Sequence, residues 1–285
     1  MKRAGLLATG LVLFLSSLLA AQEPGVRLAQ PQGGGGATIG RPISPADRPL
    51  LDPKNNRLDQ LLLLWEQRMK NVESIHVVNC TRIDKEKSGA VKTWRGEARY
   101  LKPNYAAIRL EQEEDRQFVE MMISTGTYLY EYRPQFKKLV IHDLPPPRHG
   151  QFDSNLLTFL FGMSAAEAKQ RYELTLTKDI DETNKHYIYI EVLPRFPEDK
   201  KEFTRAQLVL FASTMLPRRL WFEQPNGNQI QWDLPNMDTE TRLRPSDFQA
   251  PPPPPGWETQ RIHLPQQTPA RPEDQPRVVR PSRNG

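Results

Sequence analysis

The chain of 285 residues contains a single cysteine, Cys80. One cysteine can form no internal disulfide bond, so the folded part must be held together by packing alone. Cys80 falls inside a predicted strand, and no activating residue stands near it in the sequence. We therefore expect Cys80 to be a small buried residue and not a reactive thiol.

Sequence signatures of catalysis and metal binding are also missing. The histidines show no His-x-x-x-His pair and no glutamate at metal-binding spacing. There is no Gly-x-Ser-x-Gly elbow and no glycine loop that would cradle a phosphate. His142 and His149 bracket a Pro-rich loop, where a histidine pair is mostly a surface feature. We expect no catalytic residue, no metal and no cofactor, and a hydrolase is the weakest of the functional alternatives.

The basic charge of the chain is not concentrated on one face. The formal net charge of +5 includes Lys2 and Arg3 at the start and five arginines against three acids after residue 250. What remains in between is close to neutral, and its adjacent basic residues form only short pairs such as Lys137-Lys138. A nucleic-acid-binding protein needs a basic surface, so nucleic acid is not an expected partner.

The one long hydrophobic run lies at the N-terminus. A positive Met1-Lys2-Arg3 is followed by the apolar stretch Leu6–Leu19 and by small residues at Ala20-Ala21. This pattern predicts a signal peptide over residues 1–21 and a periplasmic or secreted protein, with an uncleaved anchor as the alternative. No cysteine lies near the cleavage site, so the protein itself should not be lipidated.

Composition divides the rest of the chain into three parts. Residues 22–52 contain a glycine run and several prolines and are predicted to be a flexible linker. Residues 53–250 are long enough to bury a substantial core as one domain. Residues 251–285 are rich in proline and arginine and are predicted to be a disordered tail, with polyproline II at Pro251–Pro255.

The domain opens with an amphipathic helix pattern. Asp52-Pro53 can start a helix of four to five turns, since proline is tolerated in the first turn. Apolar residues recur at spacings of three and four and form an apolar stripe along one side of this helix. The expected buried positions of the stripe are Leu58, Leu61, Leu62, Trp65, Met69 and Val72. Leu63 and Leu64 widen the stripe.

Period-two alternation then predicts about eleven short antiparallel strands in two groups. Between the groups lie a Pro-rich loop, the apolar segment Leu156–Met163 and a capping-box pattern at Ser164–Glu167 that predicts a short helix ending near Arg171. The predicted fold is α+β and mainly β. It is a strongly curved, incomplete antiparallel barrel with an N-terminal amphipathic helix and a short helical lid.

Several motifs in serial order resemble the LolA/LolB superfamily of periplasmic lipoprotein carriers and acceptors. They are the strand Lys102–Ile108 with its basic-Pro start, the hairpin Ser124–Pro134, the leucine-rich Leu156–Leu160 and the strand pair Leu216–Gly227. Together they cover about residues 55–250. The chain looks closest to a secreted, planctomycete-type branch of that superfamily.

The resemblance implies a concave face that holds acyl chains under a helical lid. The expected ligand-binding residues on the face are Trp94, Tyr100, Ile108, Leu110, Met121, Tyr128, Tyr130 and Tyr132. Leu156, Phe159 and Leu160 are the expected lid residues, and Lys102 is expected to meet the lid backbone or an anionic head group. Alternation alone leaves open whether the aromatic residues line an open cavity or fill a closed core.

The sequence thus predicts a non-catalytic protein, expected to be a monomer, that binds or carries a lipid or an acylated protein. The alternative is an interaction or sensor module of the cell envelope. In that case the same fold serves as a protein-binding scaffold, and the Pro-rich tail docks on an envelope protein.

Overall fold

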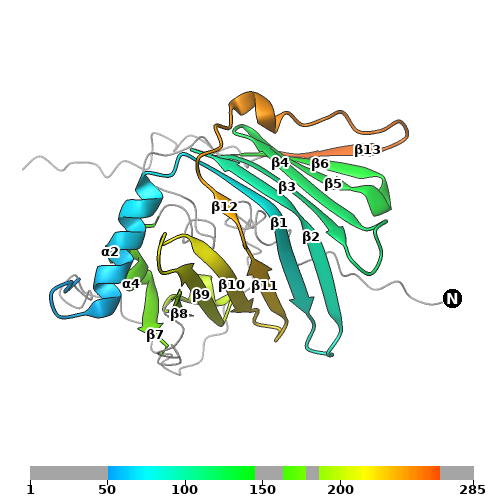
Figure 1. Cartoon of the computed structure of the whole chain (residues 1–285). Helices are drawn as coiled ribbons and strands as arrows, with labels where there is room; N and C mark the ends of the chain where they lie inside the picture. The colour runs from blue at the N-terminus through cyan, green and yellow to red at the C-terminus, as the bar shows by residue number, and fades with distance from the viewer. Residues whose placement is uncertain (1–50, 145–162, 178–185, 264–285) are drawn as a thin grey trace, which may run out of the picture.

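The computed structural model describes residues 51–144, 163–177 and 186–263, which form one curved sheet flanked by short helices (Figure 1). The 13-stranded sheet has the order β13-β6-β5-β4-β3-β2-β1-β11-β10-β9-β8-β7, and β12 pairs with β1 beside this path. The strands at the two ends of this order, β13 and β7, do not pair with each other. The sheet therefore does not close, and the barrel is incomplete. The predicted α+β, mainly β fold is therefore confirmed.

Two antiparallel meanders make up most of the sheet. The first contains β1 (Ser74–Lys85), β2 (Val91–Leu101), β3 (Tyr105–Gln112), β4 (Val119–Thr125), β5 (Tyr128–Arg133) and β6 (Lys138–Asp143). The second contains β7 (Tyr172–Leu176), β8 (Tyr187–Pro194), β9 (Arg205–Phe211), β10 (Pro217–Glu223) and β11 (Gln229–Asp233). They are joined where β1 pairs antiparallel with β11. These eleven strands are those that the alternation pattern predicts, with bounds shifted by a few residues.

Helix α2 (Arg57–Lys70) begins four residues later than Asp52-Pro53 predicts. The side chain of Asn56 accepts hydrogen bonds from the backbone N–H groups of Leu58 and Asp59, which makes Asn56 the N-cap. Each residue expected on the apolar stripe is buried, whereas Leu64 is half exposed at 49%. Among the described residues, no helix has the length and apolar character needed to cross a membrane.

The short helix α4 (Ala165–Arg171) packs beside α2 and confirms the capping-box prediction. Ser164 is its N-cap, and the Ser164 hydroxyl accepts a hydrogen bond from the backbone N–H of Glu167 at 3.2 Å. Glu66 of α2 accepts the N–H of Ala165, and the fully buried Asp59 of α2 pairs with Lys169 at 2.9 Å. The single-turn helix α5 (Pro197–Lys200) between β8 and β9 was not predicted.

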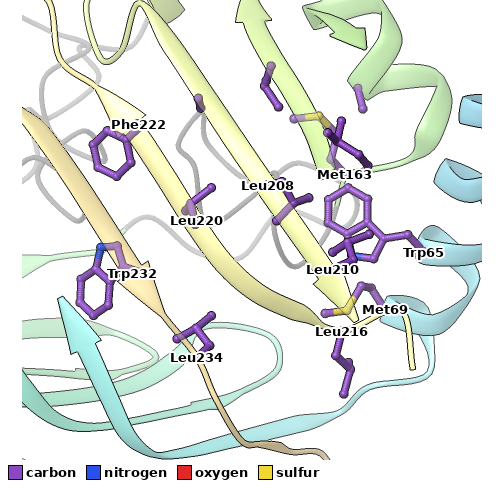
Figure 2. Close-up of a cluster of buried hydrophobic side chains, with 14 of the residues drawn as sticks. Trp65, Met69, Met163, Leu208, Leu210, Leu216, Leu220, Phe222, Trp232 and Leu234 are labelled. Atoms are coloured by element: carbon purple, nitrogen blue, oxygen red, sulfur yellow. The ribbon is translucent and has the colours of Figure 1, made fainter. Parts of the chain in front are cut away.

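The main core lies between α2, α4 and the face of the sheet that they cover. Figure 2 shows its centre, where Trp65 and Met69 of α2 and Met163 meet side chains of β9 and β10 such as Leu208 and Leu220. Cys80 of β1 is fully buried in this core, and burial raises the pKa of its thiol to about 11. The expectation that Cys80 is a buried structural residue is therefore confirmed.

A C-terminal strap, residues 243–262, extends the ordered fold beyond Ala250, where the sequence predicts disorder to begin. It contains the 3-10 helix η3 (Pro245–Phe248) and the strand β13 (Glu258–Ile262), which pairs parallel with β6. The strands β12 (Met237–Asp238) and β13 were not predicted, and they raise the number of strands in the sheet from eleven to 13. The predicted tail boundary is thus wrong for residues 251–263. The reason is that a few anchoring side chains order this segment against a distant part of the sheet.

The strap is anchored by a second, smaller core. Phe248 is 1% exposed and packs with Tyr105, Ala107, Ile123 and Leu139. In Figure 1 the strap runs over β3–β6 on the side away from α2. The sheet is therefore covered on both faces along part of its length.

Candidate functional site

Strand register divides the side chains of β2–β6 between two faces. We call the face that packs with α2 and the main core the inner face, and the face under the strap the outer face. Across β2, β3 and β4, Ala98 is opposite Ile108 and Ile108 is opposite Met122, so these three share the inner face. Residues one position away, such as Ala107 and Ile123, belong to the outer face.

Four predicted ligand-binding residues lie together on the inner face. Leu110 is fully buried and Trp94 is 7% exposed, whereas Tyr100 and Ile108 are only half-buried and pack at the margin of the main core. The Tyr100 hydroxyl donates a hydrogen bond to the carbonyl of Pro103 at 3.2 Å, and burial raises the Tyr100 pKa to about 12. This group is the part of the predicted site that the structure brings together.

The other four predicted wall residues do not join them. Met121, Tyr130 and Tyr132 belong to the small core under the strap, and Tyr128 shares their face of β5. The Tyr132 hydroxyl donates to the carbonyl of Pro251, and the guanidinium of Arg261 lies 4.7 Å from the Tyr128 ring centroid. The expectation that all eight residues share one concave face is therefore wrong, because the register of β3–β5 places these four residues on the face opposite to Ile108 and Leu110.

The three predicted lid residues Leu156, Phe159 and Leu160 lie outside the described residues. The sequence prediction also missed inner-face residues of β4–β6, of which Leu129 and Val140 are 2% and 3% exposed. Alternation places Leu129 on the face opposite to its two flanking tyrosines, but it does not say which of the two faces is the interior. The missed inner-face residues are Ala98, Met122, Leu129, Glu131, Val140 and His142.

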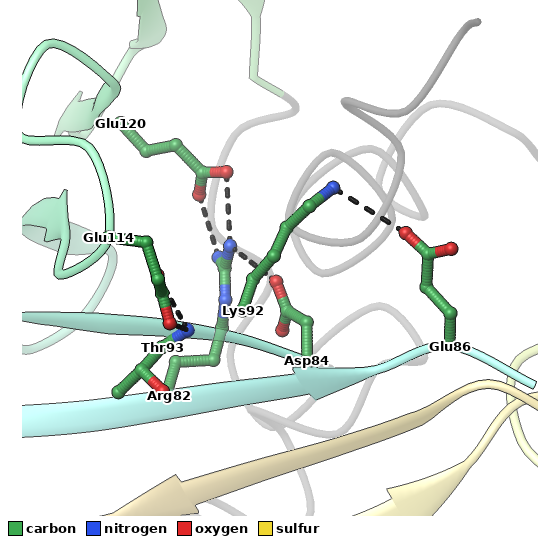
Figure 3. Close-up of polar contacts among 7 residues, drawn as sticks. All are labelled: Arg82, Asp84, Glu86, Lys92, Thr93, Glu114 and Glu120. Carbon is green, nitrogen blue, oxygen red and sulfur yellow. Dashed lines mark hydrogen bonds and ion pairs between the residues drawn. The ribbon is translucent and has the colours of Figure 1, made fainter. Parts of the chain in front are cut away.

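A buried ion cluster on the inner face surrounds Arg82, which is 2% exposed (Figure 3). Arg82 donates two hydrogen bonds to Glu120, at 2.7 and 3.0 Å, and one to Asp84 at 2.9 Å. Its guanidinium also lies 4.8 Å from the Trp94 ring and 5.7 Å from the Trp232 ring. Burial raises the pKa of Asp84 although Arg82 opposes this shift. Arg82 and Asp84 lie on β1 and Glu120 lies on β4, so the cluster connects two strands of the first meander that are not neighbours in the sheet.

A second polar group, Glu131 with His142 and Arg133, occupies the inner face of β5 and β6. The side chains of Glu131 and His142 are 9% and 8% exposed, and His142 Nε2 lies 3.5 Å from Glu131 Oε2. Arg133 donates two hydrogen bonds to Glu131, at 2.7 and 2.9 Å. Burial alone would raise the Glu131 pKa, but hydrogen bonds from His142 and Arg133 outweigh it and lower the pKa. Glu131 is thus a buried carboxylate held in its ionised form.

Lys102 does not stand free as a head-group ligand among the described residues. Its ammonium group donates to the carbonyl oxygens of Met69 at 3.2 Å and Lys70 at 2.9 Å. These carbonyls end helix α2 and have no partner within the helix, so Lys102 acts as a C-terminal cap. The position of Lys102 thus fastens α2 to the end of β2.

We expect Lys102→Met to destabilise the protein by about 1 kcal/mol, because two helix-terminal carbonyls lose a charged donor. Chemical denaturation measures this change. Lys54→Met, at an exposed position before α2, is the matched control and should stay within about 0.5 kcal/mol of the wild type. Equal effects of the two substitutions would show that Lys102 does not cap the helix.

Within the part of the chain that the structure describes, no group of three or more His, Cys, Asp or Glu side chains is arranged to hold a metal ion. The polar clusters of the inner face are ion pairs between side chains of the protein. They position strands and set the charge of the inner face.

No protein-family model matches the sequence, and the search of curated proteins returned no match. Solved structures with a similar fold do exist. A conserved protein from Thermus thermophilus has a TM-score of 0.43 and 12% identity over 71% of this chain and 98% of its own. An outer membrane lipoprotein-sorting protein domain from Vibrio parahaemolyticus has a TM-score of 0.36 and 11% identity, over 66% and 94% of the two chains.

The LolA superfamily protein NE2245 from Nitrosomonas europaea has a TM-score of 0.34 and 12% identity, over 67% of this chain and 97% of its own. The chain itself has an opening helix, two meanders and an open sheet, in the order that the sequence motifs predict.

Proposed function

We propose that this protein is exported, as a periplasmic or secreted protein, and binds or carries a lipid or lipidated protein without catalysis. The acyl chain would lie on the inner face of β2–β6. The sequence motifs that resemble lipoprotein carriers, and the signal-peptide pattern of residues 1–21, support this proposal.

The observation that carries the proposal is the half-buried apolar surface on the inner face. Helices α2 and α4 pack at the β7–β10 end of the sheet, and no described helix lies over the inner face of β3–β6 (Figure 1). On the same face, Ala98 and Tyr100 of β2 and Ile108 of β3 are only partly buried, beside the fully buried Leu110. An apolar ligand would remove this surface from water.

The energetics of acyl binding are sufficient for a carrier. Burying about a dozen methylene groups at roughly 0.8 kcal/mol each supplies close to 10 kcal/mol before the cost of association. The hydroxyl of Tyr100 at the margin of this surface would tolerate the polar junction of a lipid, since tyrosine has an apolar ring and a polar tip.

Mass spectrometry of organic extracts tests this proposal on the full-length protein, purified without detergent. We expect lipid or lipopeptide in stoichiometric amount from the wild type and its loss from Ile108→Glu, which places a charge on the inner face. Tyr130→Glu places the same charge on the outer face and is the matched control. Circular dichroism confirms that each variant is folded.

Retention of lipid in Ile108→Glu together with loss in Tyr130→Glu would place the ligand on the wrong face and contradict the proposal. Absence of lipid from all three proteins would favour the second candidate function, an interaction module of the envelope.

The strap supports that second candidate. The outer face already holds an extended, proline-rich segment through Phe248, Trp257 and the carbonyl of Pro251. Extended peptides that add to a sheet edge are a common mode of protein recognition. Under this candidate, an envelope protein would bind to the strap or to the chain beyond it, and its capture would depend on residues after 250.

A further inference from the structure

The side chain of His142 has an unsatisfied hydrogen-bonding atom on the inner face. The side chain is 8% exposed, and its Nδ1 has no hydrogen-bond partner among the described residues. A buried polar atom without a partner costs free energy, so such atoms are rare and commonly meet a ligand or a trapped water.

The neighbours of His142 determine what that atom can do. Nε2 lies 3.5 Å from the carboxylate of Glu131, which Arg133 holds in the ionised form. An imidazole beside a carboxylate carries its proton on the nitrogen that faces the carboxylate. In a neutral ring the other nitrogen is an acceptor, so in that form Nδ1 of His142 can accept a hydrogen bond from a ligand.

Apolar residues adjoin this acceptor on the same face. His142 is opposite Leu129 in the register of β5 and β6, and Leu129 is opposite Ser124 of β4. The Ser124 hydroxyl is already used, because it donates to the carbonyl of Asn104 at 2.5 Å. In the next row of the same face, Met122 of β4 and Val140 of β6 are buried on either side of Glu131. A polar acceptor thus stands at the margin of an apolar surface.

We propose that His142 binds the polar end of the ligand and selects amphiphiles whose head group donates a hydrogen bond through a hydroxyl or amide N–H. This inference rests on the proposed function, since it assumes that an acyl chain occupies the inner face. It narrows the ligand class to acylglycerols, acyl amides and similar molecules, and it disfavours esters without a donor.

Competition binding with the full-length protein tests the selection. Monododecanoylglycerol and methyl dodecanoate have the same acyl chain, but only the first has hydroxyl donors. Each ligand displaces a fluorescent fatty acid, and the result is the ratio of the two affinities. Comparing this ratio between variants cancels differences in ligand solubility.

We expect His142→Phe to reduce the ratio about tenfold, because one hydrogen bond to a buried acceptor is lost. His142→Asn keeps an acceptor near the position of Nδ1 and should keep most of the ratio. His76→Phe is the matched control, since His76 forms a similar pair with Glu97 at 3.0 Å on the outer face.

A second measurement needs no variant. The ¹⁵N resonance of His142 Nδ1 should shift when monododecanoylglycerol binds and should stay in place with methyl dodecanoate. An unchanged ratio in His142→Phe, or the same ¹⁵N response to both ligands, would overturn the selection while leaving lipid binding intact. Failure of both ligands to displace the probe would overturn the proposed function and this inference with it.

Discussion

Replacing Arg82 by methionine should lower the free energy of unfolding by about 3–5 kcal/mol at neutral pH. Arg82 is 2% exposed, and it is the cation that pairs with both Asp84 and Glu120 inside the fold. Methionine fills a similar volume but leaves two carboxylates without a cation in a shielded position. Urea denaturation measures the loss, and Arg95→Met, which removes a 65% exposed arginine paired with Glu113, should cost about 0–1 kcal/mol.

The stability deficit of Arg82→Met should depend on pH in a defined direction. Burial already raises the pKa of Asp84 above its ordinary 3.8, and removal of Arg82 raises it further. An acid whose pKa is higher in the folded state stabilises the fold when protonated and loses this contribution as the pH rises through that pKa. The deficit should therefore shrink as the pH falls towards about 4.

Two results would contradict this account of Arg82. One is a deficit that is the same at pH 4 and at pH 7, and the other is a loss no larger than that of Arg95→Met. The triple substitution Arg82→Met, Asp84→Asn and Glu120→Gln removes all three charges and should recover part of the lost stability, because no unpaired charge remains.

Phe248→Ala should detach the strap from the outer face. Phe248 is 1% exposed and is the most buried side chain of the small core. Truncating a buried phenylalanine costs about 3–5 kcal/mol when the site cannot collapse. Because this core is separate from the main one, we expect the loss to appear first as local opening of the strap.

Hydrogen exchange measured by mass spectrometry distinguishes local opening from global unfolding. Amides of β13 (Glu258–Ile262) should exchange much faster in Phe248→Ala, while those of β8–β10 keep their protection. Phe136→Ala, at a 64% exposed position beside β6, should leave both regions unchanged. Unaltered exchange of β13 in Phe248→Ala would show that the strap is held by something other than Phe248.

The local elements could be predicted because their causes are local. The three- and four-residue spacing of Leu58 to Val72 defines α2, and Ser164 with Glu167 defines the start of α4. Each of the eleven strands of the two meanders follows from alternation and from turns such as Pro225-Asn226-Gly227. The start of α2 was missed because Asn56 competes with Asp52 as the N-cap.

The faces of β4 and β5 could not be predicted, since alternation gives the period of a strand but not which side is the interior. Both Leu129 and Tyr130 are apolar, and a pattern that puts one inside puts the other outside. The strap covers the tyrosines, although it is distant from them in the sequence. Tyr132 and Pro251, which are joined by a hydrogen bond, are 119 residues apart. The sequence offered no local sign of this contact, because proline-rich segments lack the periodicity that marks buried elements.

The polar groups of the inner face escaped prediction for a related reason. Arg82, Glu131 and His142 look like ordinary charged positions within strands. Their burial and pairing depend on register between strands, as with Arg82 on β1 and Glu120 on β4, which are 38 residues apart.

Photo-crosslinking with an acyl chain that carries a diazirine near its end tests the central claim most directly, because it reports the position of the ligand itself. The full-length protein is loaded with the probe, irradiated and digested, and adducts are mapped by tandem mass spectrometry. The account predicts adducts on inner-face residues such as Tyr100, Ile108 and Met122, which excess unlabelled lipid abolishes. Adducts confined to outer-face residues such as Tyr130 and Trp257, or adducts that unlabelled lipid does not reduce, would contradict it.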